Sequence, residues 1–183
     1  MSVVSRTPSP QALSELDRRR VALWAAECAE RALPLFEHEA PDDPRPREAI
    51  TRARAFGHGE LSAAGEIRRR FVAGRAAASA STPAGVAAAR SAAQAAGVAH
   101  MGAHALGAAA YAVAAVRASH RQDAGAVDHE ITVQLDLLSP DAASALRRLP
   151  LLGSDPAGPL GAGLLASGFL GSTIREIQAR LLG

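Results

Sequence analysis

The sequence predicts an all-α fold, a compact Ala-rich bundle of six to eight helices in one domain. About a quarter of the 183 residues are alanine, which has the highest helix propensity and lets helices approach closely. Apolar residues recur at spacings of three and four along most of the chain, as they do on the buried face of a helix. The one stretch that alternates like a strand, at 131–133, would have no sheet to join.

The first expected helix follows a loose tail at residues 1–8. Ser9 before Pro10 is typical of a helix start, with the serine as the cap and the proline in the first turn. Pro34 should kink or end this helix, because proline lacks the N–H that the helix needs. The residues expected on its inner side are Leu13, Leu16, Trp24, Cys28, Ala32 and Leu35.

Three further helices are expected before residue 97. The segment at 40–49 is rich in proline and charge and predicts a rigid turn. The expected helices run from Pro46 to about residue 56, from 62 to 79, and from 83 to 96 with Thr82 as the cap.

A helix over residues 97–118 is expected at the centre of the bundle. Its apolar residues recur at helical spacing and predict a face toward the core. His100, His104 and Tyr111 recur at four and seven residues and would share another side of the same helix. Gly107 would leave a notch between them. The sequence therefore predicts a candidate site where three groups able to donate and accept protons flank a gap.

The last third of the chain carries weaker signals. Helices are expected over 126–138 and 140–149. Residues 150–183 are expected to form a hairpin of two helices, the second capped by Ser172. This segment could complete a homodimer, or its glycines could let it act as a lid over the histidine pocket.

Charge is distributed unevenly along the chain. Between Ile67 and Gln122 there are arginines but no carboxylates, whereas carboxylates are dense at 37–48. An anion that pairs with these arginines must come from another part of the chain or from a partner. The 37–48 segment is the obvious internal donor, so the turn at 40–48 is expected beside the N-terminal part of the 97–118 helix.

Composition argues against several classes of partner and cofactor. The formal net charge is only +2, and the short basic triplets lack interleaved aromatic residues, so nucleic acid is not expected as a partner. No run of about 20 apolar residues predicts a membrane span. The single Cys28 suits a reducing cytoplasm. His100 and His104 lack a third ligand on their helix, so neither a metal nor another cofactor is expected.

Two strings support a family resemblance, LWAAECAERALPLFEHEAPDDPRPREAI at 23–50 and AHMGAHALGAAAYAVAAVRA at 99–118. They resemble a family of helical, immunity-like domains linked to bacterial polymorphic-toxin systems. The resemblance implies a family-like bundle over 9–122, divergent C-terminal helices over 123–183, and a function in neutralising a toxin. The matching positions are Trp24, Cys28, Glu30, Pro34, Phe36, Glu37, Asp43, Arg45, Pro46, Arg47, Glu48, His100, His104 and Tyr111.

The sequence leaves three functional hypotheses open. The first is an immunity-like protein that neutralises a toxin or sequesters a ligand. The second is a small cofactor-independent enzyme or small-molecule binder in which His100, His104 and Tyr111 act as acid, base and orienting group. The third is a structural protein that oligomerises through its C-terminal segment. The candidate ligand-binding residues are Trp24, Cys28, Glu37, Asp43, Arg45, His100, His104 and Tyr111.

Overall fold

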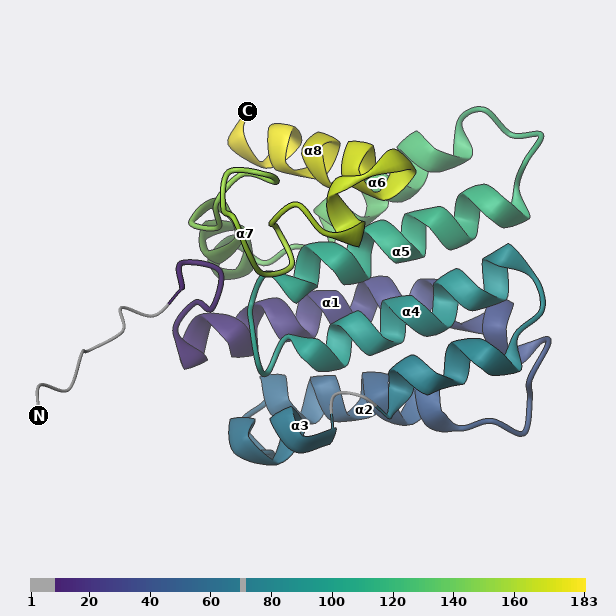
Figure 1. Ribbon diagram of the computed structural model, residues 1–183, viewed down its shortest axis with the longest axis horizontal. Helices are drawn as coiled ribbons and strands as arrows, with labels where there is room; N and C mark the ends of the chain where they lie inside the picture. Colours follow the sequence, from purple (N-terminus) through teal and green to yellow (C-terminus); the bar gives the residue numbers. More distant parts are fainter. Residues whose placement is uncertain (1–8, 70–71) are drawn as a thin grey trace, which may run out of the picture.

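The computed structural model describes residues 9–69 and 72–183, so the tail expected at 1–8 lies outside the described residues (Figure 1). Within these ranges the chain forms eight α-helices, two short 3-10 helices and no strand, which confirms the all-α prediction. The elements are α1 (Glu15–Glu37), α2 (Arg45–Gly57), α3 (Ala63–Arg69), η1 (Ala73–Ser79), α4 (Pro83–Gly97), α5 (His104–Ser119), α6 (Ala126–Asp136), α7 (Pro140–Arg147), η2 (Leu164–Ala166) and α8 (Gly168–Leu182).

Helices α1, α4 and α5 lie side by side at the centre of the bundle (Figure 1). Helices α2 and α3 lie along one side of this layer, and α6, α7 and α8 lie along the other. Helices α4 and α5 run in opposite directions, so the N-terminus of α4 and the C-terminus of α5 lie at the same end of the bundle (Figure 1). We call this end the α5 C-terminal end and the opposite one the α5 N-terminal end. Among the described residues, no helix is both long enough and apolar enough to cross a membrane.

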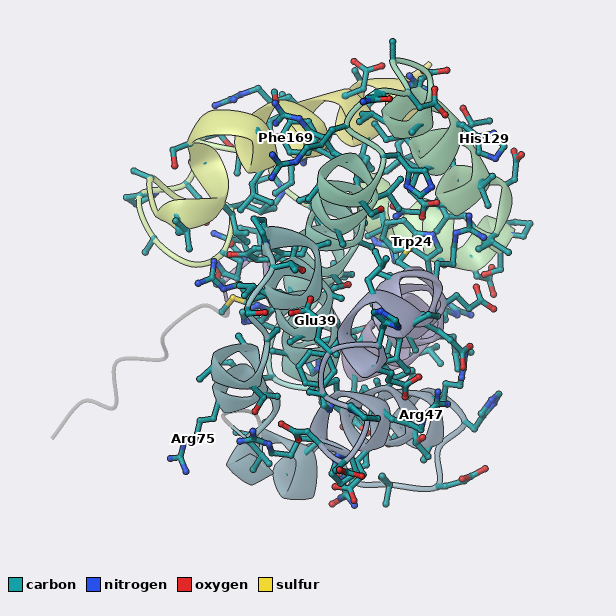
Figure 2. All side chains as sticks on the ribbon, turned by 90° about the vertical axis from the view of Figure 1, so that its right-hand side faces the viewer. Trp24, Glu39, Arg47, Arg75, His129 and Phe169 are labelled. Carbon is teal, nitrogen blue, oxygen red and sulfur yellow. The ribbon has the colours of Figure 1, made fainter. Side chains whose placement is uncertain are left out.

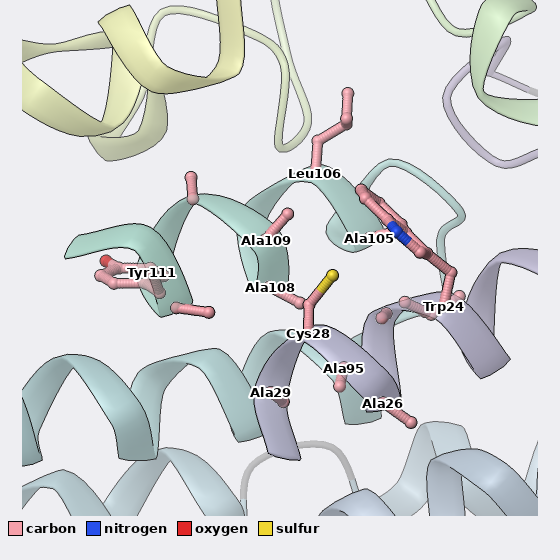
Figure 3. Packing of buried hydrophobic residues seen from close by; sticks show 14 of the residues in the cluster. Trp24, Ala26, Cys28, Ala29, Ala95, Ala105, Leu106, Ala108, Ala109 and Tyr111 are labelled. Carbon is pink, nitrogen blue, oxygen red and sulfur yellow. The ribbon is translucent and has the colours of Figure 1, made fainter. Parts of the chain in front are cut away.

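The core between α4 and α5 is built from alanines. Ala88 and Ala92 of α4 and Ala105 and Ala108 of α5 are fully buried, and Figure 3 shows part of this packing. Ser91 joins the two helices by donating its hydroxyl to the carbonyl of Ala108 at 2.7 Å. Small side chains let the two backbones approach closely, as the alanine content predicts.

The prediction of one helix over 97–118 is wrong at its N-terminal end, because α5 begins at His104. The preceding residues form a turn that contacts the N-terminal segment of the chain. The N–H of Gly102 donates to the carbonyl of Ala12 at 3.0 Å. A Cβ at position 102 would lie 2.5 Å from Leu13, whose own φ is 59°. Contact with this distant segment therefore interrupts a helical pattern that is continuous in the sequence.

The start of α1 also differs from the prediction. The helix is not capped by Ser9. Its cap is Ser14, whose hydroxyl accepts the N–H of Asp17 at 3.1 Å. Of the two outcomes expected at Pro34, a kink or an end, the end does not occur, because the helix continues to Glu37. The residues around the proline are held in the core, since Leu33 and Phe36 are buried, and this packing outweighs the lost backbone hydrogen bond.

The expected third helix over 62–79 is instead α3 followed by η1, with residues 70–71 outside the described ranges. The C-terminal hairpin of two helices is also wrong. Residues 148–163 form a loop, and α8 begins at Gly168 rather than after Ser172. The loop is bound by the side chain of Gln11, which donates to the carbonyl of Ala157 at 2.6 Å and accepts the N–H of Leu160 at 2.9 Å.

Candidate binding groove

A groove of about 870 Å³ lies at the α5 C-terminal end of the bundle. It runs between α4, α5, the loop that leads into α6, and the segment from η2 to the first turn of α8. Figure 2 faces this end of the molecule and labels Phe169, which lies on the α8 side of the groove. The lining residues are Pro83, Val86, Ala87, Arg90, Tyr111, Ala114, Arg117, Ala118, His120, Arg121, Asp123, Ala124, Val127, Leu164, Ser167, Phe169 and Leu170.

Helical periodicity explains why α4 and α5 both contribute to the groove. The lining residues of α4 span Pro83 to Arg90, and those of α5 span Tyr111 to Ala118, each at spacings of one, three or four. Such spacings place side chains on one side of a helix. Several of these side chains are small, including Ala87 and Ala114, so they leave the space open rather than fill it.

Three arginines line the groove, and two of them contact aromatic rings. The guanidinium carbon of Arg117 lies 4.2 Å from the centre of the Phe169 ring. That of Arg90 lies 5.9 Å from the centre of the Tyr111 ring. Among the ion pairs of the described residues, none involves Arg90, Arg117 or Arg121. The groove is therefore lined by three arginines and a single carboxylate, that of Asp123, so its described lining residues carry a net positive charge.

The expected internal partner for these arginines, the acidic segment at 37–48, pairs elsewhere. Glu37 binds Arg47 through two hydrogen bonds of 2.6 and 2.7 Å. Asp43 binds its near neighbour Arg45 at 2.6 Å, and this arginine holds the pKa of Asp43 below its usual range. The turn also lies at the α5 C-terminal end of the bundle (Figure 1), so its expected place beside the N-terminal part of α5 is wrong.

Glu39 is used to complete the N-terminus of α4. One of its oxygens accepts the N–H groups of Ser81 at 2.7 Å and Thr82 at 2.9 Å. The Thr82 hydroxyl donates to the other oxygen. These hydrogen bonds, that of the Thr82 side chain above all, lower the pKa of Glu39 to about 2. This carboxylate therefore satisfies backbone donors that the start of a helix leaves without partners.

The structure does not bring the two histidines together with Glu37 and Asp43, the carboxylates among the candidate ligand-binding residues. His100 lies exposed in the turn before α5, and the His104 ring lies 2.8 Å from the side-chain oxygen of Gln94. Both are at the α5 N-terminal end, whereas Glu37 and Asp43 belong to segments at the other end. Among the described residues, no three His, Cys, Asp or Glu side chains could hold a metal ion together.

The predicted notch at Gly107 is wrong, because other side chains occupy it. A Cβ at position 107 would lie 2.4 Å from the amide oxygen of Gln94 and 3.1 Å from Leu165. Tyr111, one helical turn further on, is 5% exposed and lines the groove. It is therefore the one member of the predicted His–Tyr set that reaches this site.

Trp24 and Cys28 lie in the core on the α1 face that packs against α5 (Figure 3). The indole N–H of Trp24 donates to the carbonyl of Gln134 at 2.7 Å. Burial, with the nearby charges of Glu130 and Glu27, raises the pKa of the Cys28 thiol. Neither residue lines the groove.

One comparison with known proteins gave a match. The model of a family described as Imm-5 like putative immunity protein matches residues 11–141, which is most of the chain. The chain belongs to this family. Searches of curated proteins and of solved structures found no match. The Imm-5-like range ends at the start of α7, so η2 and α8, which contribute one wall of the groove, lie beyond it.

Sequence reasoning did not select Arg90, Arg117, Arg121 or Phe169 as site residues. A signal was present for the arginines, because all three lie in the run without carboxylates. For Phe169 there was no such signal. Its contact with Arg117 joins residues 52 positions apart, and its own segment lies outside the Imm-5-like match.

Proposed function

We propose that this chain is an immunity protein that binds a protein toxin and neutralises it in the bacterial cytoplasm. Membership of the Imm-5-like family supports this proposal. So does the groove, which presents charged and apolar groups together at the surface. In the proposed mechanism, this chain binds tightly to the toxin and thereby blocks its activity.

The observation that carries the proposal is the composition of the groove. Arginine and aromatic residues are enriched among the side chains that contribute most to protein–protein binding. Here Arg117 lies over the Phe169 ring, and Leu164, which lines the same groove, is 66% exposed. Arginines without carboxylate partners among the described residues, an aromatic ring and an apolar side chain in one groove are the combination that such binding surfaces use.

The alternative of an acid–base enzyme or small-molecule binder has less support. It requires His100, His104 and Tyr111 to face one ligand. Tyr111 lines the groove but neither histidine does, and the His104 ring lies against Gln94 and Gly97 instead. Since no observation favours this arrangement, protein binding is the function that we propose.

The test is co-expression in a bacterial host with toxins encoded beside the gene for this chain. The chain should restore growth against one of them and form a complex with it that survives gel filtration. An unrelated helical protein of similar size is the control. If growth is not restored and no complex forms with any of these toxins, the proposed function is wrong.

A further inference from the structure

We propose that the groove binds an acidic segment of the toxin that also carries an apolar or aromatic side chain. The carboxylates of this segment pair with Arg90, Arg117 and Arg121, and its apolar side chain packs against Leu164 and Phe169. This inference rests on the proposed function and specifies the chemistry of the partner.

The charges around the groove favour a carboxylate-bearing partner. Asp123 is the one carboxylate among the lining residues, and its Oδ1 already accepts the N–H of Gly125 at 2.9 Å. Glu39, the acidic residue beside Pro83, is bound to Ser81 and Thr82. A guanidinium group binds a carboxylate through two parallel hydrogen bonds, and the three groove arginines have no such partner among the described residues.

The aromatic contacts prepare two of the arginines for binding. Arg117 lies over Phe169, and Arg90 lies over Tyr111. Stacking restricts the rotamers of a long side chain without using its N–H donors. Less conformational entropy is then lost when a partner binds, and this raises affinity.

The apolar wall of the groove distinguishes a protein partner from a nucleic acid. Leu164, Phe169 and Leu170 form this wall, and Leu164 is 66% exposed. A phosphate backbone would leave these side chains without apolar contacts. The net charge of +2 is also small for a nucleic-acid-binding protein. A protein segment satisfies the arginines and the wall together.

The two walls of the groove have different relations to the family. Arg90, Tyr111, Arg117 and Arg121 lie within the matched range, whereas the wall from Leu164 to Leu170 lies beyond it. We therefore assign charge recognition to the family bundle and selectivity for the apolar side chain to the C-terminal segment.

A binding experiment with defined polymers tests this chemistry. The probes are fluorescently labelled poly-glutamate, a random copolymer of glutamate and tyrosine, and single-stranded oligothymidylate, measured by fluorescence anisotropy at several salt concentrations. The copolymer should bind most tightly. Arg117→Gln and Arg121→Gln should each weaken its binding by about tenfold, since a charge-assisted hydrogen bond is lost. Phe169→Ala should remove the preference for the copolymer over poly-glutamate.

Arg75→Gln is the matched control. Arg75 is exposed and lies far from Phe169 in Figure 2, and it does not line the groove. This variant removes the same charge and should retain wild-type affinity. Equal losses in Arg75→Gln and Arg117→Gln, tighter binding of oligothymidylate than of the copolymer, or no binding of the copolymer would each overturn the inference.

The growth assay separates this inference from the proposed function. If the wild-type chain protects the host and the Arg117→Gln/Arg121→Gln double variant protects equally well at limiting expression, the inference fails and the proposed function stands. If the wild-type chain gives no protection, the proposed function itself fails. Circular dichroism of each variant confirms that the fold is retained before binding is compared.

Discussion

The α1–α2 face and the groove face of this bundle both present arginines, but in different states. On the α1–α2 face, Arg45, Arg47 and Arg54 each bind a carboxylate of the same face. On the groove face, Arg90 and Arg117 lie over aromatic rings instead. The arginines with internal partners help to hold helices together, whereas those without them remain available to a partner molecule. Ion pairing therefore separates two roles that composition alone cannot distinguish.

The largest expected effect concerns α8, whose first turn lines the groove. It tests whether the buried face of this helix contributes more to stability than its exposed face. Ile177 of α8 is fully buried, whereas Leu182 of the same helix is 59% exposed. Ile177→Ala should lower the free energy of unfolding by about 3 kcal/mol, because it leaves a cavity. Leu182→Ala should change it by less than about 0.5 kcal/mol. Urea denaturation measures both, and similar values for the two variants would contradict this picture of α8.

A second prediction concerns the partly buried ion pair that joins α6 to α1. The Glu130 side chain is 4% exposed and binds Arg31 at 2.8 Å, and it also accepts the side-chain N–H of Gln134 at 3.0 Å. Glu130→Ala should destabilise the fold by about 2 kcal/mol, since buried groups then lose their partner. Glu176→Ala, at an exposed pair with Arg180, is the control and should cost less than about 1 kcal/mol. Thermal unfolding distinguishes the two.

A third prediction uses the pH dependence of stability. Glu39 has its pKa lowered from 4.5 to about 2 in the folded state, so its stabilising effect is fully present above pH 4.5. This effect should be lost as the pH falls from 4.5 toward 2, because the unfolded chain binds the proton more tightly than the folded protein does. The difference in stability between wild type and Glu39→Gln should shrink over this window. Asp42→Asn, on the same acidic segment, should not reproduce the change; if it does, Glu39 is not the group responsible.

The smallest expected effect sharpens the contrast between the two sets of arginines. Arg45→Gln removes contacts with Asp43 and Ser79 and should lower the stability slightly, because exposed ion pairs contribute little. Arg121→Gln removes no ion pair of the described residues and should stay within about 0.5 kcal/mol of wild type. A larger loss of stability for Arg121→Gln than for Arg45→Gln would show that the groove arginine has a structural role.

Sequence signals correctly predicted helix ends that depend only on residues adjacent in the sequence. Thr82 before Pro83 gave the start of α4, where Thr82 accepts the N–H of Gly85 at 3.1 Å. The start of α1 was missed because Ser9 and Ser14 are both acceptable caps, and only tertiary contacts select the second. The start of α5 was missed because the contact of Gly102 with Ala12 joins segments that are distant in the sequence.

The site was less predictable than the fold. The pairing of His100 with His104 relied on a continuous helix, and the turn before α5 removes that premise. The absence of carboxylates around the groove arginines was visible in the sequence. However, the nearest acidic segment could be excluded as their partner only when Glu37 and Asp43 were seen to bind Arg47 and Arg45. Sequence patterns report which charges are present, and tertiary structure decides which of them remain unpaired.

The hydrogen bonds of Gln11 have a consequence for the order of folding during synthesis. Its side chain binds Ala157 and Leu160, which follow it by 146 and 149 residues. A ribosome releases the central helices long before it releases this loop. The Gln11 side chain therefore lacks these two partners until residues 157–160 have been synthesised, whereas the backbone of the same segment can pair with residues 102–103 earlier. Contacts of such long range also slow folding, so the N-terminal segment should gain its full protection from proteolysis only after residues 157–160 of the nascent chain have emerged.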